Sequence, residues 1–254
     1  MGRMKNWLPW KTSVLLMMTE EQKRRRIAEN WASVQRTVQE AAIASGRCLE
    51  SVRVIGVTKY VDESMTRALA ATGCVDLGES RPQLLWRKSE AMTDIDSVKW
   101  HMIGHLQRNK VRRSLRCRPM IHSVDSSRLL NAVAEEAEQQ ETTVKVLLEV
   151  NISGDEAKTG FLSHDLEPGL EAKPRAGVEV CGLMAMAGLG TDSTDARSQF
   201  EKVRELRDQL QAATSMALPE LSMGMSGDYQ QAILAGATMV RIGSVLFDGL
   251  IERR

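Results

Sequence analysis

The chain alternates between two patterns of hydrophobic and polar positions. Short runs rich in Val, Ile, Leu and Met with few charges predict strands that are buried on both faces. The segments between them carry apolar residues at helical spacing and charges elsewhere, as amphipathic helices do. The apolar runs lie at 52–59, 75–80, 99–105, 120–126, 144–153, 178–186, 220–226 and 239–247. This alternation predicts an α/β fold with a parallel sheet.

The segments between the runs predict the helices. They lie at 63–73, 81–92, 108–117, 126–140, 195–210 and 229–236, with a weaker one near 162–173. An extra helix precedes the first strand, from about Glu20 to Ser45, where TEEQ at 19–22 has the form of a capping box and Gly46 suits the helix end. Eight strand–helix repeats in 254 residues predict a closed (β/α)8 TIM barrel, with an open doubly wound sheet as the alternative.

The first nineteen residues follow neither pattern. They are basic and partly apolar, but Lys11 interrupts the apolar run and no small-residue cleavage site follows. We therefore expect residues 1–19 to be a disordered or loosely ordered extension, with an export signal as the alternative, and residues 20–254 to form one barrel domain. No stretch of the chain is long enough to predict a membrane span.

Charge and composition argue against several classes of protein. The chain has 34 basic and 33 acidic side chains and only 4% aromatic residues, so neither a basic footprint nor a base-stacking surface for nucleic acid is indicated. The cysteines, Cys48, Cys74, Cys117 and Cys181, form no CxxC pair, and the histidines show no HExxH spacing. Neither a zinc site nor a disulfide framework is predicted, and a reducing cytoplasm fits the composition.

The barrel fold predicts where chemistry should lie. Active residues of such barrels sit at the carboxyl ends of the strands, and phosphate is held by the loops after strands seven and eight. Lys59 ends the first apolar run, VRVIGVTK. It is either a snorkelling lysine with its ammonium in water or an amine in a pocket that can form a Schiff base with an aldehyde. Taken alone, the lysine slightly favours the first interpretation.

Two turns of small polar residues in the C-terminal third change that balance. SMGMSGD ends the seventh run and opens a helix, so Ser226 and the first amides of that helix could accept an anion. RIGS ends the eighth run, where the amides of Gly243 and Ser244 and the Ser244 hydroxyl could complete a phosphate cup. Arg241 has the same facing as Gly243 and needs a partner inside the barrel, either a strand-end acid such as Glu79 or a ring nitrogen.

Together these stretches resemble the pyridoxal-phosphate homeostasis proteins, a single-barrel family that is similar to the N-terminal barrel of alanine racemases. The matching stretches keep family order from about residue 25 to 249: VIGVTK, DLGES, WHMIGHLQRNK, HSVDS, LLEVNISGDEAKTGF, GLMAM, LSMGMSGDYQQAILAG and TMVRIGSVLF. The patterns WH-IG-LQ-NK and SMGMS-D are the most specific. The resemblance implies an alanine-racemase-like barrel that binds pyridoxal 5'-phosphate (PLP).

The resemblance also implies a set of residues around the cofactor. They are Lys59, Ser80, Ser226, Arg241, Gly243 and Ser244. Lys59 would form the Schiff base, Arg241 would contact the pyridine nitrogen, and Ser226 with the Gly243–Ser244 pair would hold the phosphate. The chain departs from the family pattern at Ser80, where an asparagine is usual, and at His105, where a proline is usual. These two departures concern the surroundings of the ring.

The family's role implies PLP homeostasis, in which the protein buffers the cofactor and passes it to PLP-dependent apoenzymes without robust catalysis of its own. An arginine can only donate, so it would favour an unprotonated ring nitrogen and a weak electron sink. One alternative is an amino-acid racemase in which His105 or Tyr60 is the second base. Another is a partner-binding protein that keeps the barrel as a scaffold. We expect a cytoplasmic monomer with no nucleic-acid or membrane partner.

Overall fold

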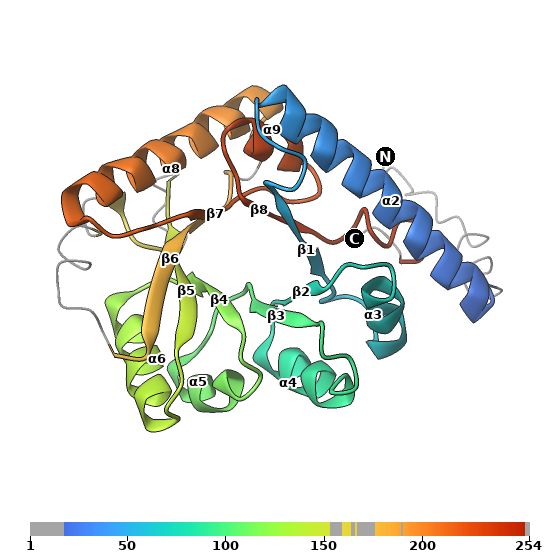
Figure 1. Ribbon diagram of the computed structural model, residues 1–254, viewed down its shortest axis with the longest axis horizontal. Helices are drawn as coiled ribbons and strands as arrows, with labels where there is room; N and C mark the ends of the chain where they lie inside the picture. Colours follow the sequence, from blue (N-terminus) through green and yellow to red (C-terminus); the bar gives the residue numbers. More distant parts are fainter. Residues whose placement is uncertain (1–17, 153–158, 164–165, 167–175, 189, 252–254) are drawn as a thin grey trace, which may run out of the picture.

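The centre of the molecule is a closed barrel of parallel strands (Figure 1). The computed structural model describes residues 18–152, 159–163, 166, 176–188 and 190–251. The strands are β1 (Arg53–Val57), β2 (Asp76–Glu79), β3 (Lys99–Met102), β4 (Met120–Val124), β5 (Val144–Val150), β6 (Val178–Ala185), β7 (Glu220–Ser222) and β8 (Met239–Ile242). They pair in chain order, and β8 pairs back to β1. The predicted barrel is confirmed, and the open sheet is wrong.

Helices follow the strands around the outside of the barrel. They are α3 (Glu63–Ala70), α4 (Pro82–Ala91), α5 (Arg108–Leu115), α6 (Ser127–Gln139), α8 (Ser193–Thr214) and α9 (Tyr229–Leu234). Each of the six stronger helix predictions is confirmed. The weaker helix near 162–173 lies largely outside the described residues. Among the described helices, none combines the length and the apolar character that crossing a bilayer requires.

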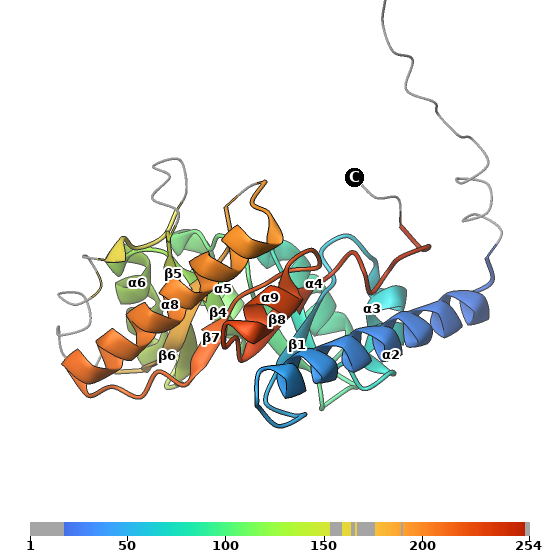
Figure 2. The same ribbon diagram turned by 90° about the horizontal axis from the view of Figure 1, so that it is seen from above.

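The extra helix α2 (Glu20–Ala44) lies against α9 and α3 on the outside of the barrel (Figure 2). Its predicted capping box is confirmed, because Thr19 and Gln22 each accept the other's backbone N–H, at 3.2 and 2.8 Å. Gly46 follows the helix end with a φ of +74°. Asn30 donates to the backbone carbonyl oxygens of residues 246 and 248, both at 3.1 Å. The helix is therefore fastened to the segment after β8. Residues 1–17 of the expected extension lie outside the described residues.

Polar side chains occupy much of the barrel interior, although the strands themselves are apolar runs. The buried polar residues on the strands include Asp76, Glu79, His101, His122, Glu149, Ser222 and Arg241. Buried polar groups are costly unless they are hydrogen-bonded, so each of these needs a partner inside the barrel. The hydrogen bonds and ion pairs among these residues determine which polar groups reach the ends of the barrel.

The pairing of β6 with β7 depends on a glycine at the point where the two backbones approach each other. Gly182 pairs with Glu220 and has a φ of +155°, and a Cβ at this position would lie 1.8 Å from the Glu220 carbonyl oxygen. The pairing of β5 with β6 shifts its register beside this residue, between Val146 and Leu147. The close approach of the two backbones therefore depends on the missing side chain.

Replacing this glycine should weaken the barrel. Gly182→Ala should lower the free energy of unfolding by at least about 2 kcal/mol, because the added methyl group forces β7 away from β6. Urea unfolding followed by tryptophan fluorescence measures the change. Gly227→Ala is the control, since a Cβ at Gly227 would meet no atom within 4 Å. Equal stability of the two variants would contradict the close approach.

Candidate functional site

Lys59 lies at the rim of the barrel, in the turn directly after β1. Its side chain is half-buried, and its Nζ lies 4.9 Å from the centroid of the Tyr60 ring in a cation–π contact. Tyr60 itself is 64% exposed. Among the described residues, no carboxylate forms an ion pair with Lys59. The amine is thus accessible from the open end of the barrel and is not committed to a partner of opposite charge.

A buried ion pair fixes the backbone that carries Lys59. Lys88, from α4, places its Nζ 2.5 Å from Glu79 Oε1 and donates to the carbonyl oxygen of Thr58 at 2.7 Å. The Thr58 hydroxyl donates to the same Glu79 oxygen at 2.6 Å. Both charged side chains are fully buried, and this burial lowers the pKa of Lys88 even though Glu79 opposes the shift. The cluster joins β1, β2 and α4 immediately before Lys59.

The role of Lys88 is not obvious from the sequence, although its position along α4 carries a signal. Lys88 follows Leu85 by three residues, and both lie on the buried face of α4. A lysine on the apolar face of a helix requires a buried acceptor. Glu79 meets that need with one oxygen only: its Oε2 is buried and has no hydrogen-bond partner among the described residues. The rim therefore keeps one unsatisfied acceptor beside the end of β2.

The two predicted turns after β7 and β8 come together at the same end of the barrel. The Gly243 amide donates to the Ser226 hydroxyl oxygen at 3.2 Å, and Ser244 follows as an exposed residue. Gly243 also packs against β1, because a Cβ there would lie 3.3 Å from the Val57 carbonyl oxygen. Lys59 is two residues beyond Val57. Three of the predicted groups thus gather where β1, β7 and β8 end.

The helix that follows Ser226 contributes less than the sequence indicated. It begins at Tyr229 and is only six residues long, after a turn over 226–228. The Asp228 carboxylate accepts the Met225 amide at 2.6 Å, so this N–H is already used. The hydroxyl and backbone groups of the two turns are therefore better candidates for contacting an anion than the amides of this short helix.

Arg241 faces the barrel interior and is only 4% exposed. Its Nη1 donates to both the carbonyl and the hydroxyl oxygen of Ser222, each at 2.7 Å, and its Nη2 donates to the Ala185 carbonyl at 3.0 Å. The suggested ion pair with Glu79 is wrong, because that carboxylate pairs with Lys88. Burial lowers the pKa of Arg241 to about 10, so the guanidinium stays charged at neutral pH. These contacts use three of its five N–H donors.

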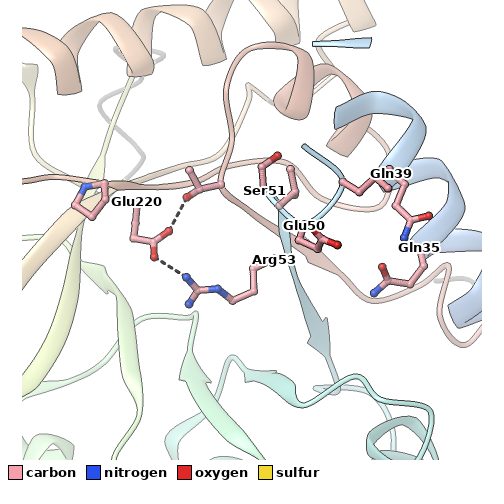
Figure 3. A pocket seen from close by; sticks show the side chains of 10 residues that line it. Gln35, Gln39, Glu50, Ser51, Arg53 and Glu220 are labelled. Atoms are coloured by element: carbon pink, nitrogen blue, oxygen red, sulfur yellow. Dashed lines mark hydrogen bonds and ion pairs between the residues drawn. The ribbon is translucent and has the colours of Figure 1, made fainter. Parts of the chain in front are cut away.

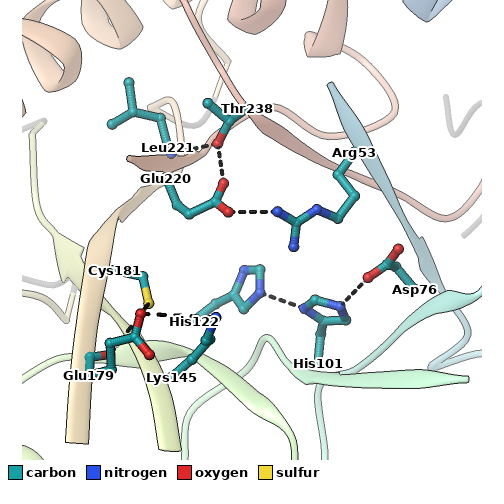
Figure 4. Close-up of polar contacts among 10 residues, drawn as sticks. All are labelled: Arg53, Asp76, His101, His122, Lys145, Glu179, Cys181, Glu220, Leu221 and Thr238. Atoms are coloured by element: carbon teal, nitrogen blue, oxygen red, sulfur yellow. Dashed lines mark hydrogen bonds and ion pairs between the residues drawn. The ribbon is translucent and has the colours of Figure 1, made fainter. Parts of the chain in front are cut away.

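A chain of hydrogen bonds continues from Arg241 across the barrel. The Ser222 hydroxyl oxygen lies 2.9 Å from His122 Nδ1, His122 Nε2 lies 2.9 Å from His101 Nδ1, and His101 Nε2 lies 2.9 Å from Asp76 Oδ1. Figure 4 shows the two imidazoles and Asp76 aligned. Burial lowers the pKa of His122 well below 6.5, with the nearby His101 and Arg241 adding to the effect. His122 is therefore neutral.

The remaining predicted residues lie at the rim without joining the other groups. Ser80 is half-buried in the turn after β2, where its backbone packs so closely that a Cβ on Gly104 would lie within 3 Å of it. His105 is exposed, and its Nδ1 lies 3.0 Å from the Asp125 carboxylate. Glu149, which the sequence analysis missed within an apolar run, accepts from the Thr159 hydroxyl at 3.0 Å, and burial raises its pKa.

Two cavities open at the opposite end of the barrel, near the amino ends of the strands. One of about 450 Å³ is lined by polar residues including Gln35, Gln39, Glu50, Ser51, Arg53 and Glu220 (Figure 3). The other, of about 580 Å³, includes Asp76 and His101 in its wall. Neither includes Lys59, Ser226 or Gly243 in its lining. The candidate site is the rim at the carboxyl ends, and Asp76 lies at the far end of the chain that leads from it.

Known proteins are similar to this chain in sequence and in fold. Residues 23–250 match the family model of the alanine racemase N-terminal domain. A curated pyridoxal phosphate homeostasis protein from Aquifex aeolicus is 38% identical over 86% of this chain and 96% of its own length, and one from Mus musculus is 31% identical over 85% and 84%. The structure of PipY from Synechococcus elongatus, determined with PLP bound, has a TM-score of 0.78 at 32% identity and covers 87% of this chain and 99% of its own.

More distant structures show the fold alone. Alanine racemase from Corynebacterium glutamicum has a TM-score of 0.64 at 15% identity, and the match covers 88% of this chain but 60% of the racemase. Together with the family model, this likeness places the barrel in the class of alanine-racemase-like barrels. Within that class, the chain belongs to the pyridoxal phosphate homeostasis protein family.

The neutral state of His122 predicts how stability depends on pH. The folded protein holds the pKa of His122 well below 6.5, so below pH 6.5 the unfolded chain binds a proton that the folded chain does not. The stability that His122 contributes is complete above this pH and is lost as the pH falls. Between pH 6 and 5 the free energy of unfolding should fall more steeply in the wild type than in His122→Gln, by up to about 1.4 kcal/mol per pH unit.

The comparison uses urea unfolding of both proteins in the same buffers. Other titrating groups are present in both proteins, so the contribution of His122 is the difference between their slopes of unfolding free energy against pH. Equal slopes would contradict a neutral, buried His122.

Proposed function

We propose that this protein binds PLP through Lys59 and acts as a carrier or buffer of the cofactor, without robust amino-acid chemistry of its own. The observation that carries the proposal is the meeting of the Ser226 and Gly243 turns beside the end of β1, next to Lys59. An amine and an anion-binding turn on one rim suit a ligand that has both an aldehyde and a phosphate. Family membership and the PLP-bound PipY structure support the same ligand.

The residues at the rim fit PLP group by group. Ser226 and Ser244 would hold the phosphate with hydroxyl and amide donors, and Gly243, whose amide donates to the Ser226 oxygen, would orient the Ser226 hydroxyl toward it. Arg241 has two N–H donors beyond its three observed contacts, and one would suit an aromatic nitrogen that accepts a hydrogen bond. Ser80 would belong to the surroundings of the ring, as the family resemblance implies. When bound, PLP supplies an aldehyde for the lysine and a pyridine ring that can take up electron density.

Lys59 is suited to a reversible covalent bond. It lies at the rim without an ion-pair partner among the described residues, and its turn is fixed by the buried cluster of Thr58, Glu79 and Lys88. The unsatisfied Glu79 Oε2 adds an acceptor near the same turn. Lys59 would hold the cofactor through its aldehyde, and the carbon–nitrogen bond, which forms with loss of one water, would be reversible by hydrolysis. A site of this kind both holds and releases the cofactor.

The nature of Arg241 supports carriage over catalysis. A guanidinium only donates, so it favours a ring nitrogen without a proton, and such a ring withdraws electrons weakly. A racemase also needs a second base opposite the lysine. The His105–Asp125 pair at the rim is the observation that keeps this alternative open, whereas Tyr60 lies against Lys59 on the exposed side.

We extend the proposal to a monomer in the cytoplasm that passes PLP to apoenzymes.

Removing the Lys59 amine should abolish retention of the cofactor. After incubation with PLP and gel filtration, the wild type should keep a visible absorption band that borohydride fixes to the protein, and Lys59→Ala should keep none. Mass spectrometry should locate the added mass on the peptide that contains Lys59. Lys110→Ala is the control, because Lys110 also rests against an aromatic ring, that of Trp86, but belongs to α5 on the outside of the barrel.

Two outcomes would contradict the proposal. Lack of a retained band in the wild type would mean that the chain is a scaffold that does not hold PLP. Interconversion of D- and L-alanine or serine by the wild type, lost in Lys59→Ala, would make it a racemase.

Phosphate recognition can be separated from the lysine bond. Ser226→Ala should weaken PLP binding by about tenfold, because a hydrogen bond to a charged group is lost and the Gly243 amide loses its acceptor. Binding of pyridoxal, which has the aldehyde and the ring but no phosphate, should change much less. Spectroscopic titration of both ligands measures the difference, and an equal loss for the two would show that Ser226 does not contact the phosphate.

A further inference from the structure

A continuous chain of buried side chains crosses the barrel from β2 to β8. Asp76 on β2, His101 on β3, His122 on β4, Ser222 on β7 and Arg241 on β8 are linked in that order by contacts of 2.7 to 2.9 Å. All five are less than 9% exposed. The first two also line the cavity at the amino ends of the strands, whereas Arg241 belongs to the candidate site. The chain therefore connects two ends of the barrel.

The residues at its two ends determine the direction of every hydrogen bond. Arg241 can only donate, so the Ser222 hydroxyl oxygen accepts from it, and the single hydroxyl proton is left for His122 Nδ1. A neutral His122 then carries its proton on Nε2 and donates to His101 Nδ1. His101 in turn donates from Nε2 to the Asp76 carboxylate, which can only accept. This single arrangement satisfies all four contacts with both imidazoles neutral.

The opposite direction is excluded by Asp76 while both histidines are neutral. If His101 donated to His122 from Nδ1, its Nε2 would present a lone pair to the carboxylate oxygen 2.9 Å away. The Ser222 hydroxyl would accept from both Arg241 and His122, and its own proton would lose its acceptor. Two buried groups would then be unsatisfied or repelled. The carboxylate on β2 thus sets the orientation of the Ser222 hydroxyl on β7.

That orientation matters for Arg241. With the proton of Ser222 directed to His122, a lone pair of the oxygen faces Nη1, and successive bonds in one direction strengthen one another. Nη1 is then fully used by Ser222, and Nη2 is anchored on Ala185. The two N–H groups that remain have a fixed position inside the barrel. They suit a neutral aromatic nitrogen that accepts a hydrogen bond.

We propose that Asp76, His101 and His122 are positioning residues that hold Arg241, through Ser222, in place for the ring nitrogen of the bound cofactor. The proposal rests on the function proposed above and adds a residue, Asp76, that lies at the other end of the barrel from Lys59. It assigns a direction to the chain of hydrogen bonds. It also predicts that replacing the acceptor at its end, Asp76, alters recognition of the ring nitrogen of the ligand.

The first test needs no cofactor. Nitrogen-15 NMR of the free protein at pH 7.5 should show His122 neutral, with a proton on Nε2 of each histidine and an acceptor lone pair on each Nδ1. Asp76→Asn keeps the size of the side chain but lets an amide either donate or accept, so the same histidines should show a mixture of the two tautomers. A protein in which either histidine carries its proton on Nδ1, or in which Asp76→Asn changes nothing, would overturn the assigned direction.

The second test uses PLP and an analogue in which a carbon replaces the ring nitrogen. Asp76→Asn and Ser222→Ala should each weaken PLP by about three- to tenfold, the range for one hydrogen bond, and leave affinity for the analogue within twofold of wild type. Ser222→Ala covers the case in which Asp76→Asn does not fold. Ser114→Ala is the matched control, since its buried hydroxyl also accepts from a ring N–H, that of Trp86, but lies on α5.

The outcomes separate the two proposals. Equal weakening of PLP and the analogue, or no weakening of either, would overturn the positioning role while leaving the carrier function intact. A wild type that binds neither ligand would overturn the proposed function and this inference with it, and the NMR result would still decide whether the chain has the assigned direction.

Discussion

The Arg241 guanidinium lies inside the barrel, where a charge is expensive, and much of the interior is arranged around it. Its observed partners are the neutral oxygens of Ser222 and Ala185, not a carboxylate. Burial lowers its pKa but leaves it protonated at neutral pH. The same positive charge disfavours protonation of His122. A permanent donor at one place therefore favours a neutral His122, and in the arrangement proposed above it also sets the direction of the hydrogen bonds behind it.

The rim depends on a second buried charge that is handled differently. Lys88 and Glu79 neutralise each other and share Thr58, so the turn before Lys59 is fixed by an ion pair with no exposed atoms. Pairing of β1 with β8 brings this turn to the side of Gly243. The barrel thus contains two buried charged clusters. One fixes the turn before Lys59 and the other fixes Arg241, the two residues to which the proposed function gives the aldehyde and the ring nitrogen.

The sequence predicted the parts of this arrangement that depend on order along the chain. Apolar runs separated by helical segments were enough for the barrel, and the carboxyl-end rule was enough to bring Ser226 and Gly243 together. It did not predict which side chains meet across the interior. Periodicity predicts which face of its strand Arg241 occupies. It does not predict the partner of Arg241, because the suggested acid, Glu79, forms its ion pair with Lys88 on α4, outside the strands. The contact between His101 and His122 was likewise not predicted, since the two residues lie on different strands and meet only when β3 pairs with β4.

The fastening of α2 to the residues after β8 has a consequence for the order of events during synthesis. Asn30 binds carbonyl oxygens more than 200 residues later in the chain, and β1 finds its second neighbour only when β8 exists. Contacts of such high sequence separation form late. A ribosome-bound chain that has already exposed Lys59 still lacks Ser226, Arg241 and Gly243. If the proposed function holds, the nascent protein carries the Lys59 amine before it has the groups that would select a phosphorylated aldehyde, and selectivity for the ligand requires the last strand.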